Sequence, residues 1–418
     1  MQEIKKFINQ ALHQEKQKFV YGKTKIPLVV PTYHEEEVCE VLDCLLTTYV
    51  TMGRKVKEFE KAFADYIGAK HAIMFNSGSS ANLIALSIVT NPWFPDRLHP
   101  GDEVIVPAVC WSTTVFPIIN CGLIPVFVDV DLDTLNLSVK KIEKALSKKT
   151  RAIIPVHLLG NPCDMRKITE IAEDKKLILI EDACEAHGAE LEGKKVGSFG
   201  LMGTFSFFFS HHISTIEGGM LVTNDDKVAE LARVMRAHGW VRDMNNKEAI
   251  IKENPDIDPR FLFVNIGYNF RPTELQGAIG IHQIKKLDDF VKIRRENARY
   301  WTEELKKYPD FFLVHDETPG TKHTWFAYPV TVAKTAPFSK KELQSFLESR
   351  GVETRQIESG NMAEQPVMKL FPHKTAGDLP NARFIMRNSF FWGNHHQIGK
   401  IERRMIINYV KEFLSEYT

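Results

Sequence analysis

The sequence predicts an α/β protein with a large, mostly parallel sheet and a smaller C-terminal α/β domain. The first observation is length, because 418 residues exceed what one simple hydrophobic core usually organises. The second is that short apolar segments alternate with helical segments between residues 72 and 223. This alternation is typical of parallel strands covered by helices on both faces.

The composition narrows the class of function. Hydrophobic residues make up 44% of the chain and charged residues 26%, and the formal net charge is only +1. A chain without a strong charge excess is a poor candidate for binding nucleic acid or an anionic membrane. No apolar run reaches membrane-spanning length, and the first residues lack the apolar core of a signal peptide. The six cysteines are scattered, with no Cys-x-x-Cys pair, so we expect reduced thiols and a cytoplasmic protein.

Residues 1–34 are expected to form an N-terminal arm, an amphipathic helix followed by an extended segment. The arm is equally compatible with packing on a partner subunit and with a plain surface extension. Between residues 35 and 66, apolar side chains recur at helical spacing on both sides of Tyr49-Val-Thr-Met-Gly53. Two helices joined by a short loop are therefore expected there.

A candidate anion site follows the first predicted strand. Residues 72–75 form this strand, and the polar turn Asn76-Ser-Gly-Ser-Ser80 leads into a helix that begins near Ala81. Free N–H groups and the helix dipole make such a helix start attractive to a phosphate group. The alternative is that Ser79 or Ser80 simply caps the helix.

The next strands are predicted at residues 103–107, 125–129, 152–156 and 177–181, with helices at 138–147 and 165–174 between them. Ligands of open α/β sheets bind at the carboxyl ends of the strands. That edge is where we expect to find Trp111, Asp182, Ser206 and His211.

Beyond residue 222 the chain becomes more polar, and a loop is expected up to about residue 259. A long helix over residues 273–305 should connect to the second domain. That domain is predicted to contain strands at 324–332 and near 351–355, and helices at 340–350 and from 401.

One stretch carries a resemblance to a known family. Gly203-Thr-Phe-Ser-Phe-Phe-Phe-Ser-His-His-Ile-Ser-Thr-Ile-Glu-Gly-Gly219 resembles the cofactor-lysine segment of the DegT/DnrJ-type sugar aminotransferases, which bind pyridoxal phosphate (PLP). The resemblance implies the aspartate aminotransferase fold (fold type I), with a seven-stranded, mostly parallel sheet. It also implies a large cofactor domain over residues 35–285 and a small one over 286–418.

The family's lysine is replaced in this chain. Family members carry lysine six residues before the glutamate of Glu-Gly-Gly, and position 211 is histidine here. Imidazole forms no stable covalent bond with PLP, but it exchanges protons near neutral pH. This change resembles the lysine-lacking 3-dehydratases of the family, such as those that act on GDP-4-keto-6-deoxy-D-mannose.

The resemblance implies an activity. The amine form of the cofactor (PMP) would support removal of the C3 hydroxyl of a nucleotide-linked 4-keto-6-deoxyhexose, giving a 4-keto-3,6-dideoxy sugar for O-antigen biosynthesis. L-Glutamate would regenerate PMP. A second group in the family uses an iron–sulfur cluster instead, which requires several cysteines. None occurs after Cys184, so no cluster is expected.

Other activities stay open at this point. The chain could be an ordinary sugar aminotransferase if Lys194 or Lys195 reached the cofactor, or a 3-dehydrase of the CDP-4-keto-6-deoxyglucose type. A catalytically inactive binding protein is a third alternative.

Cofactor roles are implied for a set of motif residues. Asp182 would pair with the pyridine nitrogen and Trp111 would stack on the ring. A helix cap and a core tryptophan are the structural alternatives for these two. His211 is the expected catalytic base. The remaining cofactor residues are expected to be Gly78, Ser79, Ser80, Glu185, Ser206 and Asn269.

The resemblance also implies residues that contact the partner subunit and the substrate. Asn269, in Gly-Tyr-Asn-x-Arg, matches a family residue that reaches the neighbouring subunit's cofactor, which implies a homodimer with a shared active site. A turn asparagine is the alternative. The candidate substrate residues are Met52, Gly53, His238, Arg242 and Arg355. No metal site is expected, because the paired histidines lack a third ligand at suitable spacing.

Overall fold

The computed structural model describes residues 2–14 and 20–417, and its centre is an eight-stranded sheet. Most neighbouring strands run parallel; only β9 is antiparallel to both of its neighbours, β1 and β8. Seven strands come from one continuous stretch, as predicted, and β14 from the C-terminal part adds a short eighth strand. In spatial order they are β1 (His71–Phe75), β9 (Gly219–Thr223), β8 (Met202–Ser206), β5 (Ile178–Asp182), β4 (Thr150–Ile153), β2 (Glu103–Pro107), β3 (Ile124–Val128) and β14 (Lys374–Thr375).

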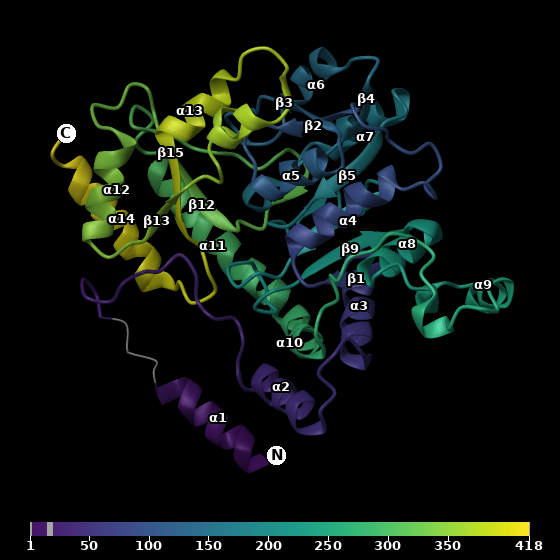
Figure 1. Cartoon of the computed structure of the whole chain (residues 1–418). Helices are drawn as coiled ribbons and strands as arrows, with labels where there is room; N and C mark the ends of the chain where they lie inside the picture. The colour runs from purple at the N-terminus through teal and green to yellow at the C-terminus, as the bar shows by residue number, and fades with distance from the viewer. Residues whose placement is uncertain (1, 15–19, 418) are drawn as a thin grey trace.

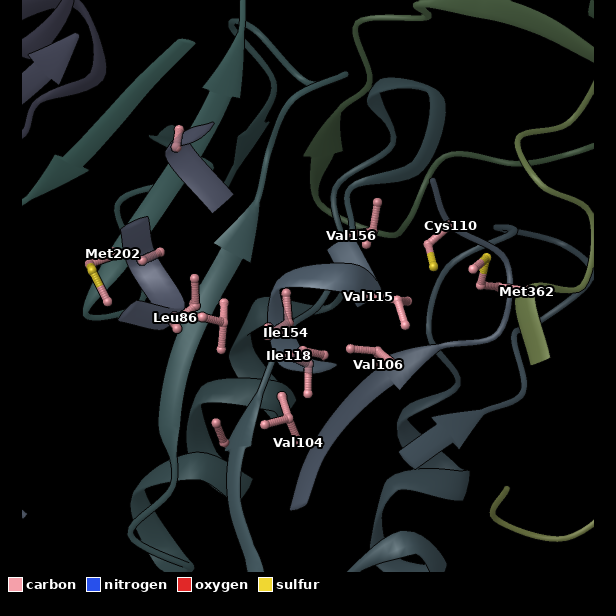
Figure 2. Close-up of a cluster of buried hydrophobic side chains, with 14 of the residues drawn as sticks. Leu86, Val104, Val106, Cys110, Val115, Ile118, Ile154, Val156, Met202 and Met362 are labelled. Atoms are coloured by element: carbon pink, nitrogen blue, oxygen red, sulfur yellow. The ribbon is translucent and has the colours of Figure 1, made fainter. Parts of the chain in front are cut away.

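Helices cover both faces of this sheet (Figure 1). Consecutive side chains of a strand point to opposite faces. Val104 and Val106 therefore pack with α4 (Gly78–Thr90), α5 (Ser112–Asn120) and α8 (Asp226–Arg236), as Figure 2 shows in part. Ile105, between them, packs with α6 (Val139–Ala145) and α7 (Met165–Asp174). At the β1 end, α3 (Arg54–Ile67) and α10 (Glu274–Gln283) cover that second face. The predicted fold class is confirmed.

The C-terminal part forms a second core around the antiparallel sheet β10-β12-β15-β13. Its strands are β10 (Phe312–Leu313), β12 (Ala327–Val332), β15 (Ser389–Gly393) and β13 (Thr354–Gln356). The helices that pack on it are α11 (Leu287–Leu305), α12 (Lys340–Ser349) and α14 (Lys400–Leu414), while α13 (Pro380–Asn388) leads into β15. The predicted strand over 324–332 starts later, because Trp325 has a φ of +49°, which a strand does not accept. The domain boundaries at residues 34 and 285 stay a prediction.

Several connections differ from expectation. The predicted loop before residue 259 contains a helix, α9 (Lys247–Glu253), at the outer edge of the molecule (Figure 1). The single helix predicted over 273–305 is two helices, α10 and α11, joined by the tight turn Ile284–Lys286. The predicted break after α2 (Glu35–Thr47) is present. A small sheet, β11-β6-β7, is formed by Thr321–Lys322, Glu190–Leu191 and Lys194–Lys195.

The N-terminal arm begins with the predicted helix, α1 (Gln2–Gln14). Residues 15–19 of the arm lie outside the described residues. Further on, Ile26 is buried; its amide donates to the Gly351 carbonyl (2.8 Å) and its carbonyl accepts from the Glu353 amide (3.0 Å). This segment therefore packs on the C-terminal part of its own chain. In the described ranges, no helix is both long and apolar enough to cross a bilayer.

Candidate active site

The polar residues predicted at the carboxyl edge of the sheet do lie at strand ends. Asp182 is the last residue of β5 and Ser206 the last of β8, while Gly78 opens α4 just after β1. Trp111 follows β2 and precedes the first residue of α5, and 55% of its surface is exposed. The parallel arrangement thus brings segments more than a hundred residues apart to one edge.

Asp182 is a buried carboxylate whose surroundings suit a cation. Its Oδ2 accepts hydrogen bonds from Thr114 Oγ1 (2.7 Å) and Asn82 Nδ2 (3.0 Å), and its Oδ1 accepts from the Cys184 amide (3.2 Å). All three donors are neutral, and no basic side chain of residues 2–14 and 20–417 forms an ion pair with it. Because burying an unpaired charge is costly, this carboxylate is best explained by a cationic ligand group.

The start of α4 forms a cradle against Ser206. A Cβ atom on Gly78 would lie 2.5 Å from the Ser206 Cβ, so only glycine permits this approach. The helix cap is Ser77, not Ser79 or Ser80: its Oγ accepts from the Ser80 amide (3.1 Å). The Ser80 hydroxyl in turn donates to Asn76 Oδ1 (2.6 Å). The amides of the first turn have no partner within a helix, so those of Gly78 and Ser79 can face an anion.

His211 is half-buried beside a group of aromatic rings. Its ring centre lies 5.2 Å from that of Phe326 and 5.8 Å from that of His187, and its Nδ1 is enclosed without a hydrogen-bond partner. Burial, together with the charge of Arg294, lowers the pKa of His211 to about 3. The ring is therefore neutral at neutral pH. The adjacent His212 is buried and packed, as predicted, with its Nε2 3.1 Å from the Thr324 carbonyl.

Two carboxyl groups stand next to each other near Asp182. Glu185 accepts a hydrogen bond from the Leu159 amide (2.7 Å), and burial, then the nearby Glu358, raises the pKa of Glu185 well above its usual range. Burial also raises the pKa of Glu358, whose φ of +43° is unfavourable for a side chain of this kind. Sequence reasoning missed Glu358, because no local motif marks it. Asn82 and Thr114 were also missed, although both lie within or beside the segments already identified at positions 76–81 and 109–113.

Three predicted residues, His238, Arg242 and Asn269, belong to a group that we call the outer cluster. Its other two members are Trp240 and Arg271. The Trp240 ring is contacted by the His238 ring (4.7 Å between centres) and by the Arg242 guanidinium (4.2 Å). Arg271 lies 5.7 Å from the same ring and donates to Asn269 Oδ1 (2.9 Å). Within the described residues, no hydrogen bond joins Asn269 to Gly78, Ser79, Ser80 or Ser206 of the same chain.

The last predicted substrate residues lie elsewhere. Gly53 precedes α3 and donates its amide to Glu274 Oε2 (2.7 Å), and Met52 packs beside the core formed by α3 and α10. Arg355 is exposed on β13, and its charge opposes the rise in the pKa of Glu358. Met52 and Gly53 are thus not brought together with Arg355 by any contact between described residues.

Comparison with known proteins identifies relatives over almost the whole chain. Residues 31–411 match the DegT/DnrJ/EryC1/StrS aminotransferase family. The GDP-4-keto-6-deoxy-D-mannose 3-dehydratase of Yersinia pseudotuberculosis is 42% identical over 373 residues, covering 88% of this chain and 94% of that protein.

Solved structures agree with that sequence relationship. A GDP-4-keto-6-deoxymannose 3-dehydratase with a trapped PLP-glutamate geminal diamine superposes with a TM-score of 0.87 at 39% identity, covering 92% of this chain and 99% of the other. A variant of that type of enzyme with bound GDP-perosamine also gives 0.87 at 39% identity, covering 93% of this chain and all (100%) of the other.

Proposed function

Since the chain belongs to the DegT/DnrJ/EryC1/StrS aminotransferase family, we propose that it is a PMP-dependent 3-dehydratase of a GDP-linked 4-keto-6-deoxyhexose. It removes the C3 hydroxyl to give a 4-keto-3,6-dideoxy sugar, and L-glutamate regenerates PMP. The GDP group is supported by the relative from Yersinia and by the related structure with GDP-perosamine. Glutamate as donor is supported by the related structure that contains a PLP-glutamate adduct.

The residues at the sheet edge fit this cofactor. The unpaired, buried Asp182 suits a protonated pyridine nitrogen, and the start of α4 with Ser206 suits a phosphate group. The exposed ring of Trp111 suits stacking on a flat aromatic group. Bound PMP would supply the amine that condenses with the C4 ketone, and a ring system that takes up the electrons left when a proton is removed and releases them as the C3 hydroxyl leaves. The residues of the protein hold and orient the cofactor and the sugar, and they move protons to and from them.

The observation that carries the proposal is the neutral imidazole of His211 at the lysine position. Because Nδ1 is enclosed, Nε2 is the nitrogen that can meet a ligand. It can take up a proton from the bound cofactor–sugar pair and return one to the departing hydroxyl. Histidine cannot release an amino sugar in the way that a lysine does, so this base favours dehydration over amino transfer.

The aminotransferase alternative required a lysine at the cofactor. Lys194 lies over the Phe199 ring (4.4 Å) and Lys195 over the Tyr66 ring (4.7 Å), both on the small sheet β11-β6-β7. Neither side chain has a contact with Asp182, Ser206 or His211 among the described residues. This placement argues against either lysine as the group that binds the cofactor.

A homodimer with shared active sites accounts for the outer cluster and for the apolar surface beside it. Tyr49, Leu46 and Ile216 are strongly exposed, and a hollow of about 710 Å³ is lined by α2, α10 and the turn around Ile216. An exposed apolar surface of this kind marks an interaction site, and a second copy of this chain is the partner that we propose. In the dimer, Asn269 and Arg242 serve the partner's pocket. We place the enzyme in the cytoplasm, where nucleotide sugars are made.

The experiment that tests this function starts from PLP-loaded protein. L-Glutamate is added, the loss of the aldehyde absorbance band is followed, and 2-oxoglutarate is assayed. The protein is then given GDP-4-keto-6-deoxymannose, and ammonia and the 3-deoxy product are measured. Stoichiometric 2-oxoglutarate followed by equal amounts of ammonia and product supports the proposal. An amino sugar in place of ammonia would show an aminotransferase instead.

A further inference from the structure

A buried arginine without an acidic partner lies close to the proposed base. Arg294 projects from α11 and is only 3% exposed. No acidic side chain within residues 2–14 and 20–417 pairs with it, whereas the next residue, Arg295, pairs with Glu317 at 3.1 Å. Burial lowers the pKa of Arg294 to about 9, so the guanidinium stays charged at neutral pH. Burying an unpaired charge is costly, and such costs are concentrated at functional sites.

The guanidinium is held by main-chain carbonyls. Its Nη1 donates to the carbonyl of Phe326 (2.6 Å) and to that of Asn394, while its buried Nε has no hydrogen-bond partner. The Asn394 amide group donates back to the Arg294 carbonyl and to the Trp325 carbonyl, both at 3.1 Å. Arg294 thus ties α11 to the segment before β12 and to the segment after β15.

The segment before β12 is the one that packs on the proposed base. The Phe326 ring centre lies 5.2 Å from that of His211 and 5.9 Å from that of His212. The carbonyl that Arg294 binds and the ring that contacts His211 therefore belong to the same residue. A shift of this carbonyl would move the wall against which the imidazole rests.

The charge of Arg294 also acts on the surrounding imidazoles. It lowers the pKa of His211, and of the buried His187, His212 and His395, after the effect of burial itself. The groups around His211 are Arg294 from α11, His187 after β5 and His212 on its own turn. No carboxylate in the described part of the chain offsets the charge at His211. An uncompensated cation here disfavours the imidazolium form.

We propose that Arg294 is a positioning residue for His211: it fixes Phe326, whose ring packs on the imidazole, and it keeps an unpaired positive charge near that ring. The inference rests on the proposed function in that His211 is taken as the base. A guanidinium that served only as a clamp would need its hydrogen bonds but not its charge. The two roles can therefore be separated by substitution.

The test compares Arg294→Met, which removes the charge, with Arg294→Lys, which keeps it but loses the forked geometry. Arg299→Met is the matched control, because it removes a charge from an exposed position of the same helix, α11. Each PLP-loaded protein carries ¹³C-labelled histidine, and the His211 signal is assigned with His211→Asn. NMR titration gives the pKa of His211 without any need for turnover.

In Arg294→Met the pKa of His211 should rise by about one unit or more, and in Arg294→Lys and Arg299→Met it should stay as in the wild type. Both Arg294 variants should lower kcat about tenfold or more, because Phe326 loses its anchor, with little change in KM for the sugar nucleotide. Arg299→Met should keep wild-type kcat.

An unmoved His211 titration in Arg294→Met would overturn the electrostatic role, and wild-type kcat in Arg294→Lys would overturn the positioning role. If Arg294→Met does not fold, Arg294→Lys still tests the positioning role. The proposal requires that this variant have a lower kcat and an unchanged His211 pKa. If the wild-type protein dehydrates no sugar, the proposed function fails, while the titrations still judge the effect of Arg294 on His211.

Discussion

A Cβ atom on Gly78 would lie 2.5 Å from the Cβ atom of Ser206, so the start of α4 and the end of β8 are as close as their backbones allow. Gly78→Ala should therefore push Ser206 away and weaken PLP binding about tenfold or more, with a small loss of stability. A fluorescence titration of the cofactor-free protein with PLP measures this. Gly399→Ala, at the start of α14, is the control, since its Cβ would meet only the flexible Glu402 side chain. Equal PLP affinity in both variants would contradict the phosphate cradle.

Asp182→Asn removes the charge of the carboxylate proposed to meet the cofactor's pyridine nitrogen while keeping a side chain of the same shape. The pyridine nitrogen then loses its charged partner, and the rate of 2-oxoglutarate formation from L-glutamate should fall about a hundredfold. Stopped-flow absorbance gives this rate. Asp164→Asn, near the start of α7, should leave it unchanged. A rate in Asp182→Asn within a few fold of wild type would mean that Asp182 is only a structural residue.

His211→Lys and His211→Asn separate cofactor capture from proton transfer. With lysine at position 211 the protein should bind PLP covalently, which shifts the absorbance band and survives gel filtration. Dehydration should drop below detection in both variants, at least about a thousandfold, because neither side chain returns a proton as the imidazole does. Product formation is followed by chromatography of the sugar nucleotide. Normal dehydration by His211→Lys would show that another group is the base.

The parts of the fold that the sequence predicts correctly are those with a clear local periodicity of apolar residues. Strand β2 (Glu103–Pro107) and helix α7 (Met165–Asp174) have the predicted bounds, because a run buried on both faces and a helix with one apolar face leave clear periodicities. Helix α9 has no buried residue in it, so its charged sequence resembled a loop. Strand β12 begins three residues late, because the backbone of Trp325 turns left-handed, which no local pattern reveals.

The site residues also divide into those that a local pattern reveals and those that it does not. Asp182, Ser206 and His211 could be located because each lies at the end of a recognisable strand or turn. Glu358 and Arg294 could not, since they reach the site from the C-terminal part through contacts that exist only after folding. The roles of the site residues remain predictions that the variants test, and the domain boundaries at residues 34 and 285 stay a prediction.

The buried His315 should make stability depend on pH. Its Nδ1 lies 2.8 Å from the Leu132 carbonyl and its Nε2 2.7 Å from Thr331 Oγ1, and burial lowers its pKa to about 4. Between pH 6.5 and 4 the unfolded chain binds a proton here that the folded protein does not, so the free energy of unfolding falls as pH falls, by about 3 kcal/mol in full. Urea unfolding of wild type and His315→Gln, at saturating PLP and one protein concentration, measures the difference in slope.

His315→Gln should flatten the acid side of that stability profile while costing stability at pH 7.5 through the lost hydrogen bonds. His99→Gln, at an exposed position, is the control and should leave the profile as in the wild type. Parallel profiles for wild type and His315→Gln would show that His315 is not the group that titrates.

The shared active site of the proposed dimer can be tested by complementation. Asn269 is bonded to Arg271 on the outer cluster and has no hydrogen bond to the cofactor cradle within the described part of its own chain. If it serves the partner's pocket, a purified heterodimer of one His211→Asn subunit and one Asn269→Ala subunit contains one intact site and one doubly defective site. Each homodimer should be nearly inactive, whereas the heterodimer should recover about half of the wild-type kcat per dimer. Subunits that both carry His211→Asn, with two different tags, control for contamination. A heterodimer without activity would place Asn269 in the pocket of its own chain, and an Asn269→Ala homodimer with wild-type activity would remove Asn269 from the site altogether.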